Sequence, residues 1–160
     1  DSIMELPLLK KAILIGPDEE AFSRVEPEFK EKVEFLSRER LLEMEETEVS
    51  AFVKNQVGEY PLYISIDKDV LCEADADTNW SQGDMRLSTM LECLGAVKEK
   101  CAERISRILG VDICGECDVT EPGNSALNDM ANAALLEFFT STDVGEDIEE
   151  NKNGTTGGNG

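Results

Sequence analysis

The sequence predicts an α/β fold in which a mainly parallel sheet is covered by helices on both faces. Short apolar segments alternate along the chain with longer segments whose apolar residues recur at helical spacing. The apolar segments do not alternate with polar residues, which is typical of strands buried on both sides of a parallel sheet. The chain has 160 residues, of which 41% are hydrophobic, and this is enough for one domain with its own core.

The first half of the chain is expected to hold three strands separated by helices. Gly16-Pro17 ends the first strand, Ser37 is the expected N-cap of the helix that follows the second, and Gly58 ends the next helix. That last helix starts at Thr47 and carries Val49, Phe52, Val53 and Val57 at helical spacing. The expected elements are a strand at 11–15, a brief helix at 18–22, a strand at 33–36, a helix at 38–46, a helix from 47 and a strand at 62–66.

The second half of the chain is expected to form two longer helices and a fourth strand. Ser88 is the expected N-cap of a helix with Met90, Leu91, Leu94 and Val97 on its inner face. A strand is expected at 108–114, and a turn at 122–124 precedes a last helix. The buried stripe of that helix is expected to be Leu127, Met130, Ala134, Leu135 and Phe138.

These elements predict one α/β domain at 1–140. An acidic tail at 141–160, rich in Gly, Asn and Thr, is expected to be disordered in solution. Four strands form a small sheet for this fold class, which indicates an incomplete domain.

Composition excludes several classes of function. The 15 basic and 35 acidic residues give a formal net charge of −20, which disfavours nucleic acid and anionic membrane surfaces as partners. There is no histidine, so a Ser-His or Cys-His nucleophile within this chain is excluded. Five cysteines, an odd number, and the absence of a long apolar run or signal peptide favour a reduced, cytoplasmic protein.

The most informative segment is the expected strand that ends in Asp67-Lys68-Asp69. Side chains alternate along a strand, so Asp67 and Asp69 are expected to point the same way, roughly 6.6 Å apart along the backbone. Ligands of open α/β sheets bind at the carboxyl ends of strands, and two carboxylates there can share a divalent cation. In the alternative interpretation, one Asp caps the following turn and the other is solvated.

Two further segments are expected at the same edge of the sheet. The loop at 72–83 is strongly polar and holds Trp80, the only tryptophan; it either carries binding groups or is a connector whose Trp packs back on the sheet. Glu116 follows the fourth strand and is expected to join Asp67 and Asp69. Cys114 and Cys117 form a C-x-x-C pair that is a redox pair, half of a zinc site, or two buried structural thiols, the last being the default.

These residues together resemble the carboxyl-terminal half of the ureohydrolase superfamily, which includes arginase, agmatinase and formiminoglutamase. The family's Ser-x-Asp-x-Asp motif is matched at 65–69, its Thr-containing loop at 78–83 and its later strand-end Glu at Glu116; the similarity extends over about 12–139. It implies a three-layer α/β/α fold and a binuclear manganese centre, with magnesium as the alternative. Asp67 and Asp69 would be metal ligands, Glu116 would face the guanidinium-like end of the substrate, and Thr78 would lie near it.

The implied activity is metal-dependent hydrolysis of a guanidino compound or another linear amidine or amide. The chain departs from the family in two loops, at Cys72-Glu73 and at 77–80, and is most similar to uncharacterised arginase-like bacterial proteins. The family's His ligand and its Asp-x-His-x-Asp element are absent from this sequence. Because each cation needs about six ligands, we expect the chain to be inactive by itself.

Two other interpretations fit part of the pattern. In a haloacid-dehalogenase-type, Mg-dependent phosphatase, Asp67 would be the nucleophile and Asp69 the acid/base, although that motif usually opens the chain. In a non-catalytic arginase-fold binding module, the chain would bind only a cation or a partner. The expected partners are a small-molecule substrate and either a second copy of the chain or a complementing amino-terminal segment.

Overall fold

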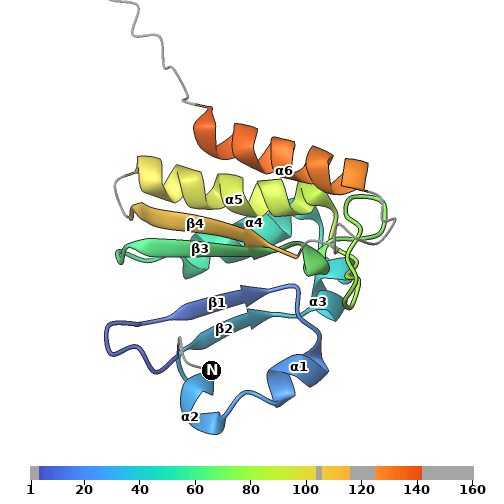
Figure 1. Ribbon diagram of the computed structural model, residues 1–160. Coiled ribbons are helices and arrows are strands. Elements are labelled where there is room, and N and C mark those ends of the chain that lie inside the picture. The colour runs from blue at the N-terminus through green and yellow to red at the C-terminus, as the bar shows by residue number, and fades with distance from the viewer. Residues whose placement is uncertain (1–3, 104–105, 116–124, 142–160) are drawn as a thin grey trace, which may run out of the picture.

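The computed structural model describes residues 4–103, 106–115 and 125–141, and strands alternate with helices throughout this part of the chain (Figure 1). The expected tail lies almost wholly outside the described residues. The elements are β1 Ala12–Ile15, α1 Glu19–Ser23, α2 Pro27–Lys30, β2 Val33–Leu36, α3 Arg38–Glu43, α4 Glu46–Gln56, β3 Leu62–Asp67, the 3₁₀ helix Lys68–Val70, α5 Leu87–Ala102, β4 Ile108–Cys114 and α6 Ser125–Thr140.

The described strands are all parallel to their hydrogen-bonded neighbours, which confirms the α/β class. β1 pairs with β2, and β3 pairs with β4. In Figure 1 the four arrows point to the same side of the molecule, so the carboxyl ends of the strands lie at a common edge. The expectation of a single four-stranded sheet is wrong for the described residues, because hydrogen bonds form two sheets of two strands each. The apolar pattern identifies extended segments and does not decide which of them come within hydrogen-bonding distance.

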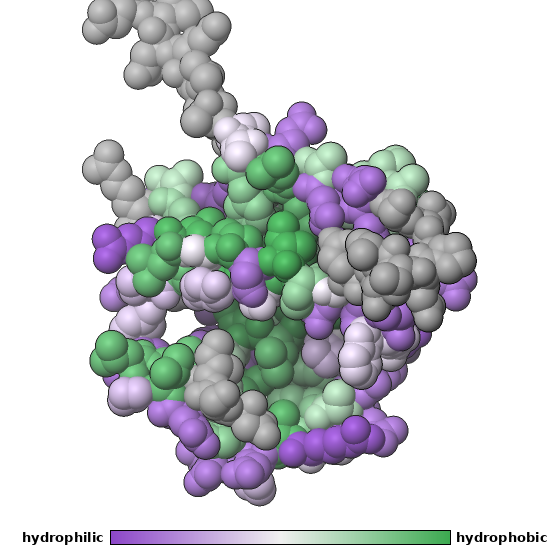
Figure 2. All heavy atoms as spheres, in the orientation of Figure 1, coloured by the Kyte–Doolittle hydropathy of each residue, from purple (hydrophilic) through white to green (hydrophobic). Residues whose placement is uncertain are grey.

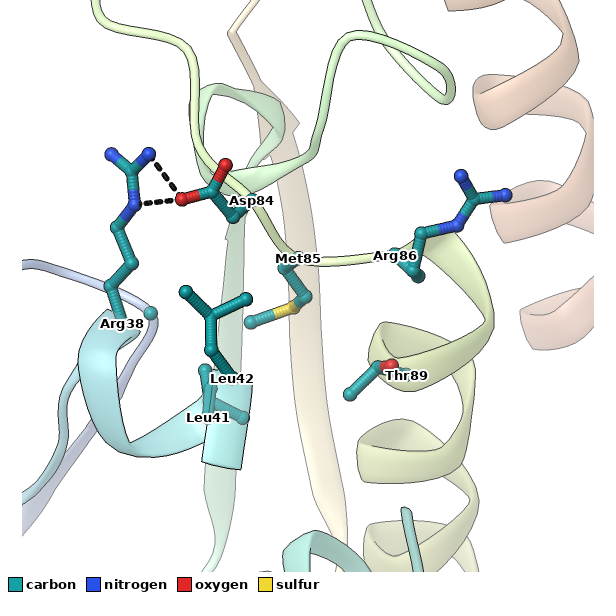
Figure 3. Close-up of a pocket in the computed structure, with 8 residues that line it drawn as sticks. Arg38, Leu41, Leu42, Asp84, Met85, Arg86 and Thr89 are labelled. Carbon is teal, nitrogen blue, oxygen red and sulfur yellow. Dashed lines mark hydrogen bonds and ion pairs between the residues drawn. The ribbon is translucent and has the colours of Figure 1, made fainter. Parts of the chain in front are cut away.

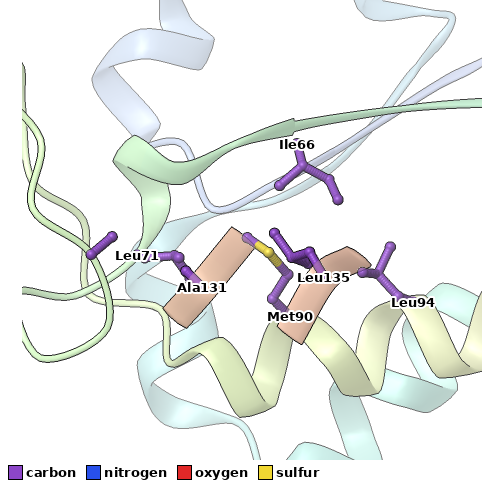
Figure 4. Close-up of a cluster of buried hydrophobic side chains, with 7 residues drawn as sticks. Ile66, Leu71, Met90, Leu94, Ala131 and Leu135 are labelled. Atoms are coloured by element: carbon purple, nitrogen blue, oxygen red, sulfur yellow. The ribbon is translucent and has the colours of Figure 1, made fainter. Parts of the chain in front are cut away.

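Helices α5 and α6 cover one face of β3 with a compact apolar cluster (Figure 4). Leu94 from α5 and Leu135 from α6 meet Ile66 of β3, and Leu135 is fully buried. Such burial of a large aliphatic side chain stabilises a fold by about 1.5–3 kcal/mol relative to exposure. The buried members of the cluster are Ile66, Leu71, Ala76, Met90, Leu94, Ala131 and Leu135.

A second apolar cluster joins β1 and β2 to α4 and α5. Val49 and Val53 of α4 pack with Leu36 of β2, and Cys93 and Ala96 of α5 complete the contact. Because α5 contributes to both clusters, it links the two small sheets. On the opposite face of β2, the ring of Phe35 stacks on Phe22 of α1 with 4.1 Å between ring centroids.

The expectation that every strand is covered on both faces is wrong for β3. Its residues alternate between covered and exposed positions, and Tyr63, Ser65 and Asp67 are exposed. The pattern is therefore that of a half-covered strand. Figure 2 shows that this side of the molecule, opposite α4, is hollowed and has hydrophobic residues in the hollow. The sequence of β3 does not show that one face is uncovered, because Tyr63 and Ser65 are compatible with either a buried or an exposed position.

Helix starts depend on capping groups that local sequence identifies only in part. The prediction for Ser37 is confirmed, since its hydroxyl accepts a hydrogen bond from the Arg40 N–H at 3.2 Å. The prediction for Ser88 is wrong: α5 begins at Leu87, whose N–H donates to the Asp75 carboxylate at 2.9 Å. A cap supplied from twelve residues away leaves no local signal.

Two other boundaries differ from the predictions. The helix expected at 38–46 ends at Glu43, and α4 starts one residue before the expected Thr47 because Glu45 and Glu48 form a capping box.

The buried stripe of α6 also differs from the predicted one. Met130 is 69% exposed, while Asn128 and Ala131 are buried. None of the helices in the described part of the chain is long and apolar enough to cross a membrane.

Two adjacent leucines of α6 test this assignment of its faces. Leu135→Ala is expected to lower the free energy of unfolding by about 2–5 kcal/mol, because it opens a cavity against α5 and β3. Leu136 is 63% exposed, so Leu136→Ala should change that free energy by less than about 0.5 kcal/mol. Urea titrations followed by circular dichroism measure both values. Equal effects of the two substitutions would show that α6 is rotated from the orientation described.

Candidate metal and ligand site

The two carboxylates do not extend from one straight strand, because β3 ends at Asp67. The chain then turns through the 3₁₀ helix, and the Asp67 carboxylate accepts a hydrogen bond from the Asp69 N–H at 3.1 Å. The predicted strand geometry for this pair is therefore wrong. Of the alternative interpretation, the turn cap is confirmed at Asp67, whereas the expectation that the other Asp is solvated is wrong, because Asp69 Oδ1 is buried. The two carboxylates are nevertheless close enough to interact, as the pKa of Asp69 shows.

Asp69 is the electrostatically perturbed member of the pair. Burial raises its pKa above the ordinary value of 3.8, and the negative charge of Asp67 raises it further. The Thr78 hydroxyl partly offsets this rise, although no hydrogen bond of regular geometry joins the two groups: Asp69 Oδ1 and Thr78 Oγ1 are both buried without a hydrogen-bonding partner. Two unpartnered oxygens beside a second carboxylate form an environment that a cation would stabilise.

The end of β4 lies directly against this turn. Gly115 has a positive φ of 80°, and a Cβ atom at this position would lie 2.6 Å from Asp67 Oδ1. Only glycine fits here without displacing the carboxylate. The ends of β3 and β4 therefore share one edge, as the sequence predicts. Glu116, the next residue, lies outside the described residues together with Cys117, so its expected place beside Asp67 remains a prediction.

Two residues of β4 lie in register with the end of β3: Asp112, which was not expected there, and Cys114, which was expected at this edge as part of the C-x-x-C pair. Ser65 Oγ donates to Asp112 Oδ2 at 3.0 Å, and Asp112 Oδ1 is buried without a hydrogen-bonding partner. Cys114 pairs in register with Asp67. Strand register would have identified Asp112, but the sequence alone does not provide it.

The C-x-x-C interpretations can be judged at Cys114. Cys114 is an exposed residue whose sulfur is only partly shielded from solvent, so the default of a buried structural thiol is wrong at this position. Burial of the sulfur and the charges of Asp67, Asp112 and Asp69 raise the pKa of Cys114. A reactive redox thiol needs the opposite environment, one that stabilises the thiolate.

Lys68 is an unexpected buried charge between the two aspartates. Its side chain is fully buried, and Nζ donates to Asn132 Oδ1 of α6 at 2.9 Å. Buried ammonium groups are rare unless they are hydrogen-bonded. The turn thus separates its side chains: Lys68 contacts α6, while the two carboxylates lie at the strand ends.

The loop after the turn is held by side-chain amides. Asp77 N–H donates to Asn128 Oδ1 at 3.0 Å, and Asn128 Nδ2 donates back to the Asp77 carbonyl at 2.7 Å. Gln82 Nε2 donates to the carbonyls of Leu71 at 2.5 Å and Ala76 at 3.2 Å. Between these anchors Trp80 is 81% exposed. The interpretation in which this Trp packs back on the sheet is therefore wrong.

A small pocket of about 170 Å³ lies apart from the aspartate pair, between α3 and the start of α5 (Figure 3). Its arginines are already ion-paired: Arg38 Nε donates to Asp84 at 2.5 Å, and Arg86 Nε lies 3.1 Å from the Asp75 carboxylate. Neither of the two aspartates nor Thr78 lines it. The lining residues are Gly16, Arg38, Leu41, Leu42, Asp84, Met85, Arg86 and Thr89.

The described residues do not form a complete metal-binding set. Among residues 4–103, 106–115 and 125–141, no three His, Cys, Asp or Glu side chains are grouped so that they could hold an ion. The site described here is therefore a carboxylate pair with a neighbouring hydroxyl, to which other groups would have to be added.

Comparison with known proteins gives limited further information. No family model matches the chain. It is 35% identical over 85 residues to an uncharacterized protein of Thermotoga maritima. The match covers 52% of this chain and 32% of the relative, so the chain spans about a third of the length of the curated protein it matches.

The pKa of Asp69 gives a test of the unbalanced charge. Because this pKa is raised on folding, ionisation of Asp69 lowers the stability of the folded chain as the pH rises above the ordinary value of 3.8. Asp69→Asn removes that penalty. Its free energy of unfolding in metal-free buffer should therefore exceed the wild-type value at pH 7, and the difference should disappear as the pH falls below 3.8.

Urea titrations at several pH values measure this difference. Asp129→Asn, at an exposed position of α6, is the matched control and should stay within about 0.5 kcal/mol of the wild type. Loss of stability in Asp69→Asn at pH 7 would mean that the carboxylate is already balanced by a partner.

Proposed function

We propose that this chain contributes to a ureohydrolase-like binuclear metal site, with Asp67 and Asp69 as ligands of manganese or magnesium. The observation that supports this most directly is the buried, unpartnered Oδ1 of Asp69 beside the Asp67 carboxylate. A divalent cation would balance both charges and give that oxygen a partner. The proposal includes the three-layer arginase-like fold, of which the two parallel strand pairs and their helices would form part.

The described residues fit such a metal centre in part. Asp67 and Asp69 supply oxygen ligands of the type that Mn²⁺ and Mg²⁺ prefer. Two carboxylates leave most coordination positions to other groups, so further ligands would have to come from a complementing segment or a second chain. When bound, the metal pair would activate a water molecule for attack on a guanidino or amidine carbon.

The roles of this chain's own side chains follow from their positions. Asp67 and Asp69 would hold the ions, and the unpartnered Thr78 hydroxyl would hydrogen-bond to the substrate beside them. Glu116 would face the guanidinium-like end of the substrate, by its place in the family motif. Lys68 and Asn128 would act as positioning residues, since one fixes the turn and the other fixes the loop.

Manganese binding tests the ligand assignment. Paramagnetic resonance of free Mn²⁺ titrated with the 160-residue chain should show weak binding, about millimolar, because most positions on the ion remain with water. Asp67→Asn and Asp69→Asn should each weaken it about tenfold or more. Asp129→Asn changes the net charge equally and should leave it unchanged. If all three variants bind alike, the attraction arises from the overall negative charge and the assignment fails.

Turnover distinguishes the ureohydrolase proposal from the phosphatase alternative. With Mn²⁺, the isolated chain is expected to release no measurable urea from guanidino compounds, because the ligand set is incomplete. With Mg²⁺, it should also leave p-nitrophenyl phosphate intact. Phosphate release that is lost in Asp67→Asn would favour the haloacid-dehalogenase-type mechanism, and urea release would show that the chain is complete.

A further inference from the structure

We propose that the space between β1 and β3 binds one extended segment of a second polypeptide, which would join the two small sheets into one. As the means by which further groups reach the metal site, this binding rests on the proposed function, whereas the strand seat itself rests on the backbone of β1 and β3. Three observations carry it: the unpaired edges of these two strands, their common direction, and the opening between them.

The edge of β1 that faces away from β2 has unpaired main-chain groups. Ala12 N–H donates to the Lys32 carbonyl at 2.8 Å, which fixes the side of β1 on which the ladder to β2 lies. Main-chain groups alternate between the two edges of a strand, so the N–H and C=O groups of Ile13 and Ile15 point away from β2. Among the described residues, no strand pairs with this edge.

The edge of β3 that faces away from β4 is unpaired in the same way. Leu62 N–H donates to the Arg107 carbonyl at 2.8 Å, so the main-chain groups of Leu62 are directed toward β4. Those of Tyr63 and Ser65 are divided by the same alternation: both point away from β4, and no described strand pairs with them. Both strands therefore offer donors and acceptors on their second edge.

These two edges face each other. Figure 1 shows the strands in the order β4, β3, β1, β2 across the molecule, with their arrows in a common direction. Ile13 and Ile15 of β1 and Leu62 of β3 pack against the same apolar cluster of α4 and α5, so the two strands are neighbours. Their carboxyl ends converge, since a Cβ atom at Gly16 would lie 3.3 Å from Val70 Cβ. Toward the amino ends, Figure 2 shows an opening between the two sheets.

An extended main chain is the group that matches both edges at once. Its own N–H and C=O groups alternate, so one residue would pair with β3 and the next with β1. A strand edge without a partner is a template for pairing with another chain, and here two such edges lie on either side of one space. Each described strand already has a partner, so a second copy has no spare strand among its described residues to supply.

The side chains beside the seat define the chemistry of the segment. On the side of α4 and α5 they are apolar, since Ile13, Ile15 and Leu62 pack there. On the opposite side β3 presents the exposed Tyr63 and Ser65. The matching segment is therefore short, with β-branched apolar residues toward the helices alternating with polar residues toward solvent. A parallel orientation would continue the pairing seen in both small sheets.

Hydrogen exchange followed by NMR tests the seat in the metal-free 160-residue chain. The probe is the synthetic peptide acetyl-Lys-Thr-Ile-Thr-Val-Thr-Lys-amide. In the free chain the N–H groups of Ile13 and Ser65 should exchange quickly, and the peptide should slow them about tenfold or more, while Leu14 and Ile64, which face β2 and β4, should not change. Slow exchange of Ile13 and Ser65 in the free chain would mean that the two sheets pair directly and would overturn the proposal.

Methylated peptides separate the seat from an outer edge of a sheet. N-methylation of either the Ile and Val amides or the three Thr amides removes the donors on one edge and keeps every side chain and charge. Because the seat pairs with the segment on both sides, each methylated peptide should bind about tenfold more weakly or worse. If only one of them is weakened, the peptide lies on a single edge and the proposal fails. If neither is weakened, the lysines alone attract the peptide to the acidic chain, and it fails as well.

A matched pair of variants locates the contact on β3. Tyr63→Pro removes an N–H that faces the seat and leaves the ladder to β4 intact, so it should weaken peptide binding about tenfold or more. Tyr63→Ala removes the same exposed ring, keeps the N–H, and should stay within about threefold of the wild type. Circular dichroism checks that both variants are folded. Equal affinities of two folded variants would refute the assignment; if Tyr63→Pro does not fold, the exchange and methylation results decide.

The outcome is separable from that of the proposed function, because the peptide has no metal-binding side chain and metal is absent. Peptide binding without a manganese site that depends on Asp67 would refute the proposed function and leave this inference standing. Manganese binding that depends on Asp67, without peptide binding, would refute this inference alone.

Discussion

The turn at the end of β3 is the constraint on which the site depends. Over three residues, this turn directs the side chain of Lys68 toward α6, while the carboxylates of Asp67 and Asp69 lie at the strand ends. Asn132 of α6 accepts a hydrogen bond from Lys68. Asn128, one helical turn earlier, accepts one from the N–H of Asp77 in the loop that follows the turn. One face of α6 thus fixes both sides of the site, and the apolar packing of Leu135 keeps that face in place.

The charges at this edge of the sheet are expected to lower the stability of the folded chain. The charge of Asp69 is partly buried and stands next to Asp67, and Asp112 adds an unpartnered buried oxygen on the neighbouring strand. Such groups are retained at functional sites more often than in structural cores, because their charge is needed there.

Much of the fold could be predicted from the sequence because strand and helix periods are local properties. The strands at 33–36 and 108–114 were predicted with the observed bounds, and Ser37 was recognised as a cap. The Ser88 cap and the inward position of Met130 were wrong, because the group that caps α5 is remote in sequence and α6 is apolar on more than one side. At the site, the pattern Asp-x-Asp did not predict the 3₁₀ turn that begins after Asp67, and the position of Asp112 required the strand register.

The hollowed side of the molecule has a consequence for how the chain behaves at high concentration. Hydrophobic residues in that hollow, together with the exposed Tyr63, would favour self-association of a neutral protein. The formal charge of −20 keeps copies apart at neutral pH by mutual repulsion. Acidification or concentrated salt weakens this repulsion and leaves the hydrophobic attraction in place. The acidic surface therefore also acts as a colloidal stabiliser for a sheet face that no described helix covers.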